Sequence, residues 1–136
     1  MKDSPFFDTN VLIYAFAKPD PRCAVAEQLL SKRGVVSVHV LNEFVAVSYG
    51  RLKKPIAEIR EALSVIALAC PSPLPISSQV HEAALRIMVR YGYHIYDAVV
   101  IAAALQAGCT TLYTEDMHDG QVLEGLTIRN PFRATA

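Results

Sequence analysis

Residues 5–14, Pro-Phe-Phe-Asp-Thr-Asn-Val-Leu-Ile-Tyr, contain the pattern that decides the predicted fold. The apolar run at 5–7 has the length and composition of a short buried strand, and residues 10–16 place apolar side chains at helical spacing. Asp8 therefore stands where a strand turns into a helix. In open α/β sheets, ligands bind in the crevice beyond the carboxyl ends of the strands. The pattern makes Asp8 the first candidate for an active-site group.

The rest of the chain alternates between helical and strand patterns. Proline, glycine and serine positions predict further helices from Asp20 and Pro21 to about Lys32, from Leu41 to near Gly50, from Pro55 through Ala67, from Ser77 or Ser78 to Gly92, and from Tyr96 to Ala107. Strand patterns fall at 35–38, at Ile76, at 110–113 and at 126–128. Such alternation predicts an α/β fold, with one domain over residues 1–136 and a mainly parallel central sheet of about five short strands flanked by helices in an α/β/α sandwich.

The composition favours a tightly packed globular chain. Of the 136 residues, 52% are hydrophobic and 19% are charged, which disfavours disorder. A chain of this length should fold as one domain that buries about two-thirds of its unfolded surface. The high apolar fraction also favours an apolar subunit interface, so we expect a homodimer or a hydrophobic partner.

Opposite charges balance, with 13 Lys and Arg against 13 Asp and Glu. The chain therefore lacks the global positive field that marks many nucleic-acid binders, and any contact with nucleic acid must be local. The densest basic cluster is Arg51, Lys53 and Lys54, with Lys32 and Arg33 as a second candidate. On charge alone, both clusters are also compatible with solvated loops.

Cysteine usage and hydropathy predict a soluble cytoplasmic protein. Cys23, Cys70 and Cys109 are odd in number and lack a C-x-x-C spacing, which indicates reduced, mostly buried thiols rather than disulfides or a zinc site. The first residues lack the pattern of a signal peptide. Since no apolar stretch reaches the roughly 18 residues that span a bilayer, we expect no membrane partner.

Four acids accompany apolar segments. Asp8 follows the first strand, Glu43 lies within the helix after the second, Asp97 begins the most apolar helix, and Asp116 follows the fourth strand. Because the strands of a parallel sheet end at a shared edge, these carboxylates could face a single pocket. Taken singly, Asp97 could be a helix N-terminal acid, Glu43 an exposed helix residue and Asp116 a turn former.

Further polar residues near these acids are candidate supporting groups. Thr9, Asn10 and Thr114 have short side chains suited to orienting a carboxylate or a metal-bound water, and Asp119 could be a fifth acid. Turn formation would explain these four residues too.

A hard divalent cation is the natural partner of such a cluster, because clustered carboxylates repel one another and cannot all stay ionised alone. Mg²⁺ prefers oxygen ligands, and two such ions about 4 Å apart can support phosphodiester cleavage. The four histidines are spread out, and no Ser or Cys lies in a nucleophile-elbow or P-loop motif. Metal-assisted hydrolysis is therefore the predicted chemistry.

Four segments together resemble the PIN-domain ribonucleases, and in particular the VapC-like toxins of bacterial toxin–antitoxin pairs. They are Phe7-Asp8-Thr9-Asn10-Val11-Leu12-Ile13-Tyr14, Asn42-Glu43-Phe44, Tyr96-Asp97-Ala98-Val99-Val100-Ile101-Ala102-Ala103-Ala104 and Leu112-Tyr113-Thr114-Glu115-Asp116-Met117. The order and spacing of the segments carry the resemblance, which covers nearly the whole chain.

This resemblance implies a PIN-like fold and Mg²⁺- or Mn²⁺-dependent endonucleolytic cleavage of RNA. By matching position it implies an acidic quartet of Asp8, Glu43, Asp97 and Asp116, with Asp8, Asp97 and Asp116 as metal ligands and Thr114 as the small hydroxyl residue before the last acid. Asp119 lies where the family varies. The resemblance also implies homodimers and inhibition by a small antitoxin whose C-terminal segment wraps the toxin and reaches its pocket.

Two alternatives remain open on the sequence. In a haloacid-dehalogenase-like phosphatase, Asp8 would attack phosphate as a nucleophile. Against this, Asn10 stands where that family has a second acid, and Leu12 stands where it has Thr or Val. In a catalytically silent PIN-fold interaction module, loss of the acids would leave the biological effect intact.

Overall fold

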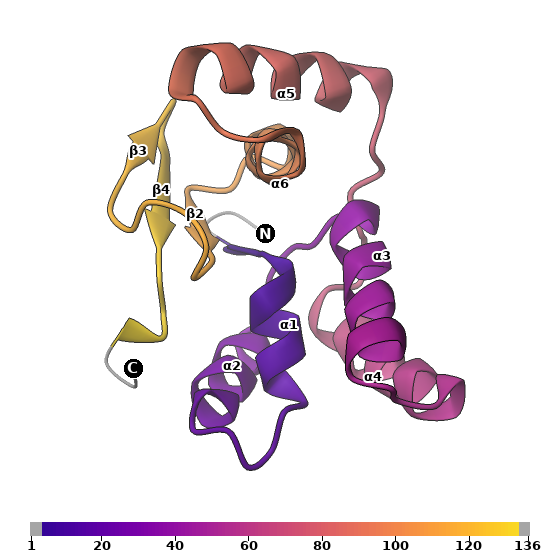
Figure 1. Ribbon diagram of the computed structural model, residues 1–136. Coiled ribbons are helices and arrows are strands. Elements are labelled where there is room, and N and C mark those ends of the chain that lie inside the picture. Colours follow the sequence, from indigo (N-terminus) through magenta and orange to yellow (C-terminus); the bar gives the residue numbers. More distant parts are fainter. Residues whose placement is uncertain (1–3, 134–136) are drawn as a thin grey trace.

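The computed structural model describes residues 4–133 and arranges their helices around a four-stranded sheet (Figure 1). The strands are β1 (Phe6–Phe7), β2 (Thr111–Tyr113), β3 (Val122–Leu123) and β4 (Leu126–Arg129). The helices are α1 (Thr9–Ala15), α2 (Arg22–Ser31), α3 (Val38–Ala46), the π-helical turn η1 (Val47–Arg51), α4 (Ile56–Ala69), α5 (Ser78–Tyr91) and α6 (Ile95–Gln106). In Figure 1, α5 and α6 lie together at the top, and α1–α4 lie together in the lower half.

The sheet is mainly parallel, which confirms the prediction. Its order is β1-β2-β4-β3, with parallel pairing of β1 to β2 and of β2 to β4, and antiparallel pairing of β3 to β4. The sequence pattern does not predict β3. This strand is two residues long and is joined to β4 by Glu124 and Gly125, whose φ angles are 51° and 90°. A Glu-Gly pair lacks the Asn-Gly or Asp-Gly signal by which such hairpins are found in a sequence.

Two predicted strands are wrong. Residues 35–38 make isolated parallel bridges, to β1 on one side and to Leu74 on the other. Ser37 ends the extended backbone because its side chain accepts a hydrogen bond from the Val40 backbone N–H (3.2 Å) and caps α3. Ile76 lies outside the strands, since the bridge falls at Leu74. Both segments therefore lie beside the sheet without forming regular strands in it.

Two helix boundaries agree closely with the prediction. Ser77 caps α5, and its side chain accepts a hydrogen bond from the Val80 backbone N–H at 3.2 Å. At the other end of α5, Gly92 takes the left-handed conformation (φ 78°), which a glycine adopts without strain. The serine and glycine signals thus set both ends of the helix.

The α-helices other than α5 begin one to three residues from the predicted start, and α2 and α3 are examples. α2 begins at Arg22 rather than at Pro21, and the Asp20 carboxylate still accepts a hydrogen bond from the Arg22 backbone N–H (2.9 Å). α3 begins at Val38 rather than at Leu41, because Ser37 caps it. The consequence is that α3 carries Glu43 in its middle.

The core is centred on α6. All seven residues from Ala98 to Ala104 are buried, which confirms the prediction for the most apolar helix. The three cysteines are also buried and free. Among residues 4–133, no helix is long and apolar enough to cross a membrane.

Candidate active site

Five carboxylates line one cleft of about 530 Å³, and four of them are the acids that the sequence singled out. These five acids are Asp8, Glu43, Asp97, Glu115 and Asp116. The parallel register brings two of the contributing segments together, because β1 and β2 are neighbours and end at the same edge. The helices α3 and α6, which also contact each other, bring the acids of the other two segments.

Asp8 lines the cleft and is buried, with 5% of its surface exposed. It follows β1 directly, and its backbone N–H donates to the carbonyl of Tyr113, the last residue of β2 (3.0 Å). Its side chain caps α1: Oδ1 accepts from the Thr9 backbone N–H (2.7 Å), and Oδ2 accepts from the Thr114 hydroxyl (2.8 Å). The carboxylate is thus fixed by the first residue of α1 and by the residue that follows β2.

Thr114 and Asn10 link the two sides of the cleft. The Asn10 side-chain amide donates to the Thr114 hydroxyl oxygen (3.2 Å) and to Asp116 Oδ2 (3.1 Å). The Asp116 backbone N–H also donates to the Thr114 hydroxyl oxygen (3.1 Å). Asp116 is therefore held by Asn10, a residue of α1.

Glu43 joins the cleft from α3. Its Oε1 accepts a hydrogen bond from the Thr9 hydroxyl (2.9 Å), and His39, one helical turn earlier, places Nε2 3.6 Å from the same oxygen. The His39 ring stacks on Tyr96, with centroids 5.7 Å apart. Asp97, the residue after Tyr96, lies in the first turn of α6.

The acids influence one another electrostatically. Burial raises the pKa of the Asp8 carboxyl from 3.8 to about 7, opposed by its hydrogen bonds, and the charges of Asp116 and Glu43 raise it further. Burial also raises the pKa of Asp97; His94 opposes this, and Asp116 and Glu43 add to it. A cation in the cleft would relieve both effects.

The model of the PIN domain family matches residues 6–118. The chain belongs to the PIN domain family. The match includes all five carboxylates of the cleft, and no curated protein matches the chain.

Solved structures share this PIN fold. A toxin–antitoxin complex from Klebsiella pneumoniae aligns with a TM-score of 0.71 and 24% identity over 94% of this chain and 98% of that one. The Mycobacterium tuberculosis toxin VapC20, described as cleaving the sarcin–ricin loop, aligns with a TM-score of 0.65 and 22% identity over 83% and 92%. VapBC2 from Rickettsia felis, bound to a promoter DNA fragment, aligns with a TM-score of 0.65 and 20% identity over 93% and 97%.

The donor set of this PIN domain fits a hard divalent cation. Carboxylate oxygens are the ligands that Mg²⁺ prefers, and it is typically held by one or two of them together with waters and substrate phosphates. Across residues 4–133, no three acidic, histidine or cysteine side chains converge into a ready-made metal cage. The cleft therefore suits an ion with an incomplete protein shell better than an ion enclosed by protein.

Three predicted site residues lie elsewhere or serve other contacts. Asp119 accepts hydrogen bonds from the Asn130 backbone N–H (2.7 Å) and from Arg133 (3.0 Å), so it ties the end of β4 instead of lining the cleft. Lys54 donates to the Phe16 carbonyl (3.1 Å) and pairs with Glu58 on α4. Lys53 is exposed and, like Lys54, is absent from the cleft wall.

Sequence reasoning missed two polar residues of the cleft, Tyr14 and Glu115. Tyr14 lies one helical turn after Asn10 on the same face of α1. Glu115 stands between two residues that were singled out, Thr114 and Asp116. The helical spacing was a usable signal for Tyr14, whereas the direction of the Glu115 side chain depends on contacts with α1 and α2.

Proposed function

We propose that this PIN domain is a metal-dependent endoribonuclease that hydrolyses RNA phosphodiester bonds in the cytoplasm. The observation that supports it is the convergence of Asp8, Glu43, Asp97 and Asp116 on one cleft of a PIN domain. An acid whose neutral form is favoured by burial, and further by neighbouring carboxylates, is typical of a site that takes a cation.

We assign Asp8, Asp97 and Asp116 to the site of the ion, Mg²⁺ or Mn²⁺, with waters and substrate phosphate completing its shell. When bound, such an ion supplies an activated water and stabilises charge on the leaving oxygen. The chain's own residues fix the carboxylates: the Thr114 hydroxyl orients Asp8, and the Asn10 amide orients Asp116. These hydrogen bonds preorganise the acids before substrate arrives.

Glu43 completes the acidic quartet. Its hydrogen bond from the Thr9 hydroxyl keeps one carboxylate oxygen in place on the cleft wall. We assign Glu43 to hold a water beside the scissile phosphate or to accept a proton from that water. This role needs a carboxylate that is oriented but still reachable, and the Glu43 side chain is 41% exposed.

Arg51 is the basic residue that we assign to the RNA backbone. It ends the π-helical turn η1 and lines the cleft, and within residues 4–133 it forms no ion pair. One basic side chain in a cleft lined by acids agrees with the zero net charge of the chain. Arg51→Ala should raise KM, while Lys53→Ala, outside the cleft, should leave KM unchanged. Equal effects of both substitutions would contradict the assignment.

We further propose that the protein is the toxin of a toxin–antitoxin pair and forms a homodimer. Two of the structural relatives are toxin–antitoxin complexes, VapBC2 being the one described with promoter DNA. An apolar groove of about 410 Å³ between α2 and α4, with Leu30, Val65 and Leu68 among its lining residues, offers a surface for an antitoxin segment. Co-expression with the protein of an adjacent short reading frame should suppress toxicity, and light scattering should give twice the chain mass.

The decisive experiment compares Asp97→Asn with Asp119→Asn. The first removes a proposed metal ligand, and the second removes a carboxylate that lies outside the cleft. Asp97→Asn should lower RNA cleavage by more than about 100-fold, the upper end of what loss of an outer-shell partner costs a metal site. Asp119→Asn should retain it. Cleavage at the wild-type rate in Asp97→Asn would refute the proposed mechanism.

The competing functions make different predictions. Membership of the PIN family removes the haloacid-dehalogenase alternative, and Asn10 donates to Thr114 and Asp116 instead of serving as a second acid. If the domain were a silent interaction module, Asp97→Asn would leave growth inhibition intact. A growth assay with this variant therefore separates the nuclease from the module.

A further inference from the structure

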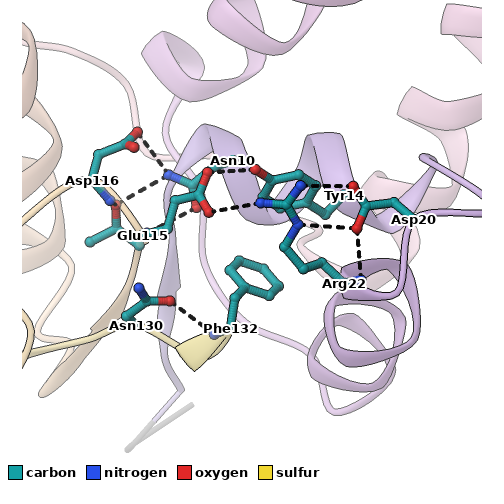
Figure 2. A network of polar contacts seen from close by, with 9 residues as sticks. Asn10, Tyr14, Asp20, Arg22, Glu115, Asp116, Asn130 and Phe132 are labelled. Carbon is teal, nitrogen blue, oxygen red and sulfur yellow. Dashed lines mark hydrogen bonds and ion pairs between the residues drawn. The ribbon is translucent and has the colours of Figure 1, made fainter. Parts of the chain in front are cut away.

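Glu115 is the one carboxylate of the cleft whose two oxygens are both engaged by groups of α1 and α2 (Figure 2). The Tyr14 hydroxyl donates to Oε2 at 2.6 Å. Arg22 places Nη1 3.5 Å from Oε1. Both oxygens of the Glu115 carboxylate are therefore already engaged by protein groups.

Arg22 is itself held firmly. Its Nε and Nη2 donate to the two oxygens of Asp20, at 3.0 and 2.8 Å, in a bidentate pair. Its guanidinium carbon lies 4.0 Å from the centre of the Tyr14 ring. The Phe132 ring packs in an edge-to-face arrangement against the Tyr14 ring, with centroids 4.9 Å apart. Arg22 and Phe132 thus hold the Tyr14 ring from two sides, and the Arg22–Asp20 pair holds Arg22.

This group is connected to the acidic quartet through residues 114–116. The Glu115 backbone N–H donates to the Asn10 side-chain carbonyl oxygen (3.3 Å), and the Asn10 amide group donates to Asp116 Oδ2 (3.1 Å). Asn10 and Tyr14 are one turn apart on α1, so one helix face grips the Glu115 backbone and its side chain at once. Moving Glu115 would turn Asn10, and with it the Asp116 carboxylate.

We propose that Tyr14, Arg22 and Glu115 form a latch that positions Asn10 and Asp116 for metal binding. In this latch Glu115 is a positioning residue and not a metal ligand. The assignment rests on the proposed metal-dependent function. In addition, the metal affinity of the cleft then depends on Arg22 of α2 and on Phe132, which packs against Tyr14. Phe132 lies beyond the residues that the family model matches.

The test substitutes Tyr14→Phe, which removes the donated hydrogen bond and keeps the ring that contacts Arg22 and Phe132. The matched control is Tyr93→Phe, which also removes a hydroxyl that donates to a side-chain oxygen, Gln121 Oε1 at 2.5 Å, but lies outside the cleft. Three quantities are measured on each purified full-length protein: the affinity for Mn²⁺ alone by calorimetry, the free energy of unfolding, and kcat and KM on a fluorescent single-stranded RNA of mixed sequence.

Tyr14→Phe should weaken Mn²⁺ binding about 10-fold, which is the lower end of the effect seen for outer-shell partners of metal ligands. It should also lower kcat with little change in KM. Tyr93→Phe should leave both unchanged even if it lowers stability. Glu115→Gln, which keeps an acceptor for Tyr14 but loses the charge that attracts Arg22, should fall between the wild type and Tyr14→Phe. Arg22→Lys should behave similarly, because lysine lacks the bidentate fork.

Mn²⁺ affinity within twofold of wild type in both Tyr14→Phe and Glu115→Gln, with lowered stability alone, would overturn the latch and leave a purely structural contact. The proposed function fails separately, if the wild type binds Mn²⁺ but cleaves no RNA. In that case a weaker Mn²⁺ affinity in Tyr14→Phe would still support the latch. A wild type that binds no Mn²⁺ would overturn both proposals.

Discussion

Replacing Asp8 by asparagine should stabilise the metal-free protein above neutral pH while abolishing cleavage. Burial raises the pKa of the Asp8 carboxyl from 3.8 to about 7, so the folded state binds this proton more tightly than the unfolded chain does. Wild-type stability is therefore highest below the ordinary pKa of 3.8, falls as the pH rises toward 7, and is constant above that. Asparagine carries no such proton, so Asp8→Asn does not undergo this loss.

The magnitude follows from the contacts of the side chain. Linkage across the difference between 3.8 and about 7 corresponds to about 4 kcal/mol at pH 8. An asparagine carbonyl still accepts from the Thr9 backbone N–H, but its NH₂ group no longer accepts from the Thr114 hydroxyl, which costs about 1–2 kcal/mol. Asp8→Asn should therefore be about 2–3 kcal/mol more stable than wild type at pH 8, and about 1–2 kcal/mol less stable near pH 4.

Urea unfolding in the presence of a chelator, between pH 4 and pH 8, measures this difference. Asp119→Asn is the control of opposite sign, because hydrogen bonds from the Asn130 backbone N–H and from Arg133 lower the pKa of Asp119. That variant should lose stability at neutral pH, and the loss should vanish as the pH falls through the Asp119 pKa. Added Mg²⁺ should stabilise the wild type and have little effect on Asp8→Asn. A stability difference between Asp8→Asn and wild type that is the same at both ends of the pH range would refute the reasoning.

Further predictions concern packing, reactivity and the hydroxyl below the cleft. A Cβ on Gly34 would lie 2.4 Å from the Phe7 ring, so Gly34→Ala should lose about 1–3 kcal/mol of unfolding free energy. Gly50 has open space around it, so Gly50→Ala should change the unfolding free energy by less than about 1 kcal/mol. Comparable losses in the two variants would contradict the close approach at Gly34. Burial raises the pKa of the Cys70 thiol to about 11, so labelling by a disulfide reagent at pH 8 should be slow until urea is added; equal native and unfolded rates would argue against this burial. Thr114→Val should destabilise the fold by about 1–3 kcal/mol, and Thr114→Ser should restore most of it, as urea titration will show.

Local sequence patterns were sufficient for the elements that depend on nearest neighbours. The strand-acid-helix order at Asp8 was predicted correctly because apolar spacing and capping chemistry act within a few residues. Ser77 and Gly92 fixed α5 for the same reason. The strand predicted at 35–38 was wrong because Ser37 caps a helix there, a competition between two local signals that only the packed chain resolves.

The sequence by itself determined which acids the chain has and that each accompanies a buried element. The tertiary structure decided which of them meet. It brought Glu115 into the cleft and left Asp119 at the end of β4, although both occupy the same loop region. The physical reason is that side-chain direction, burial and the resulting pKa of Asp8 depend on residues over a hundred positions away, such as Thr114, which are adjacent only after β1 and β2 pair.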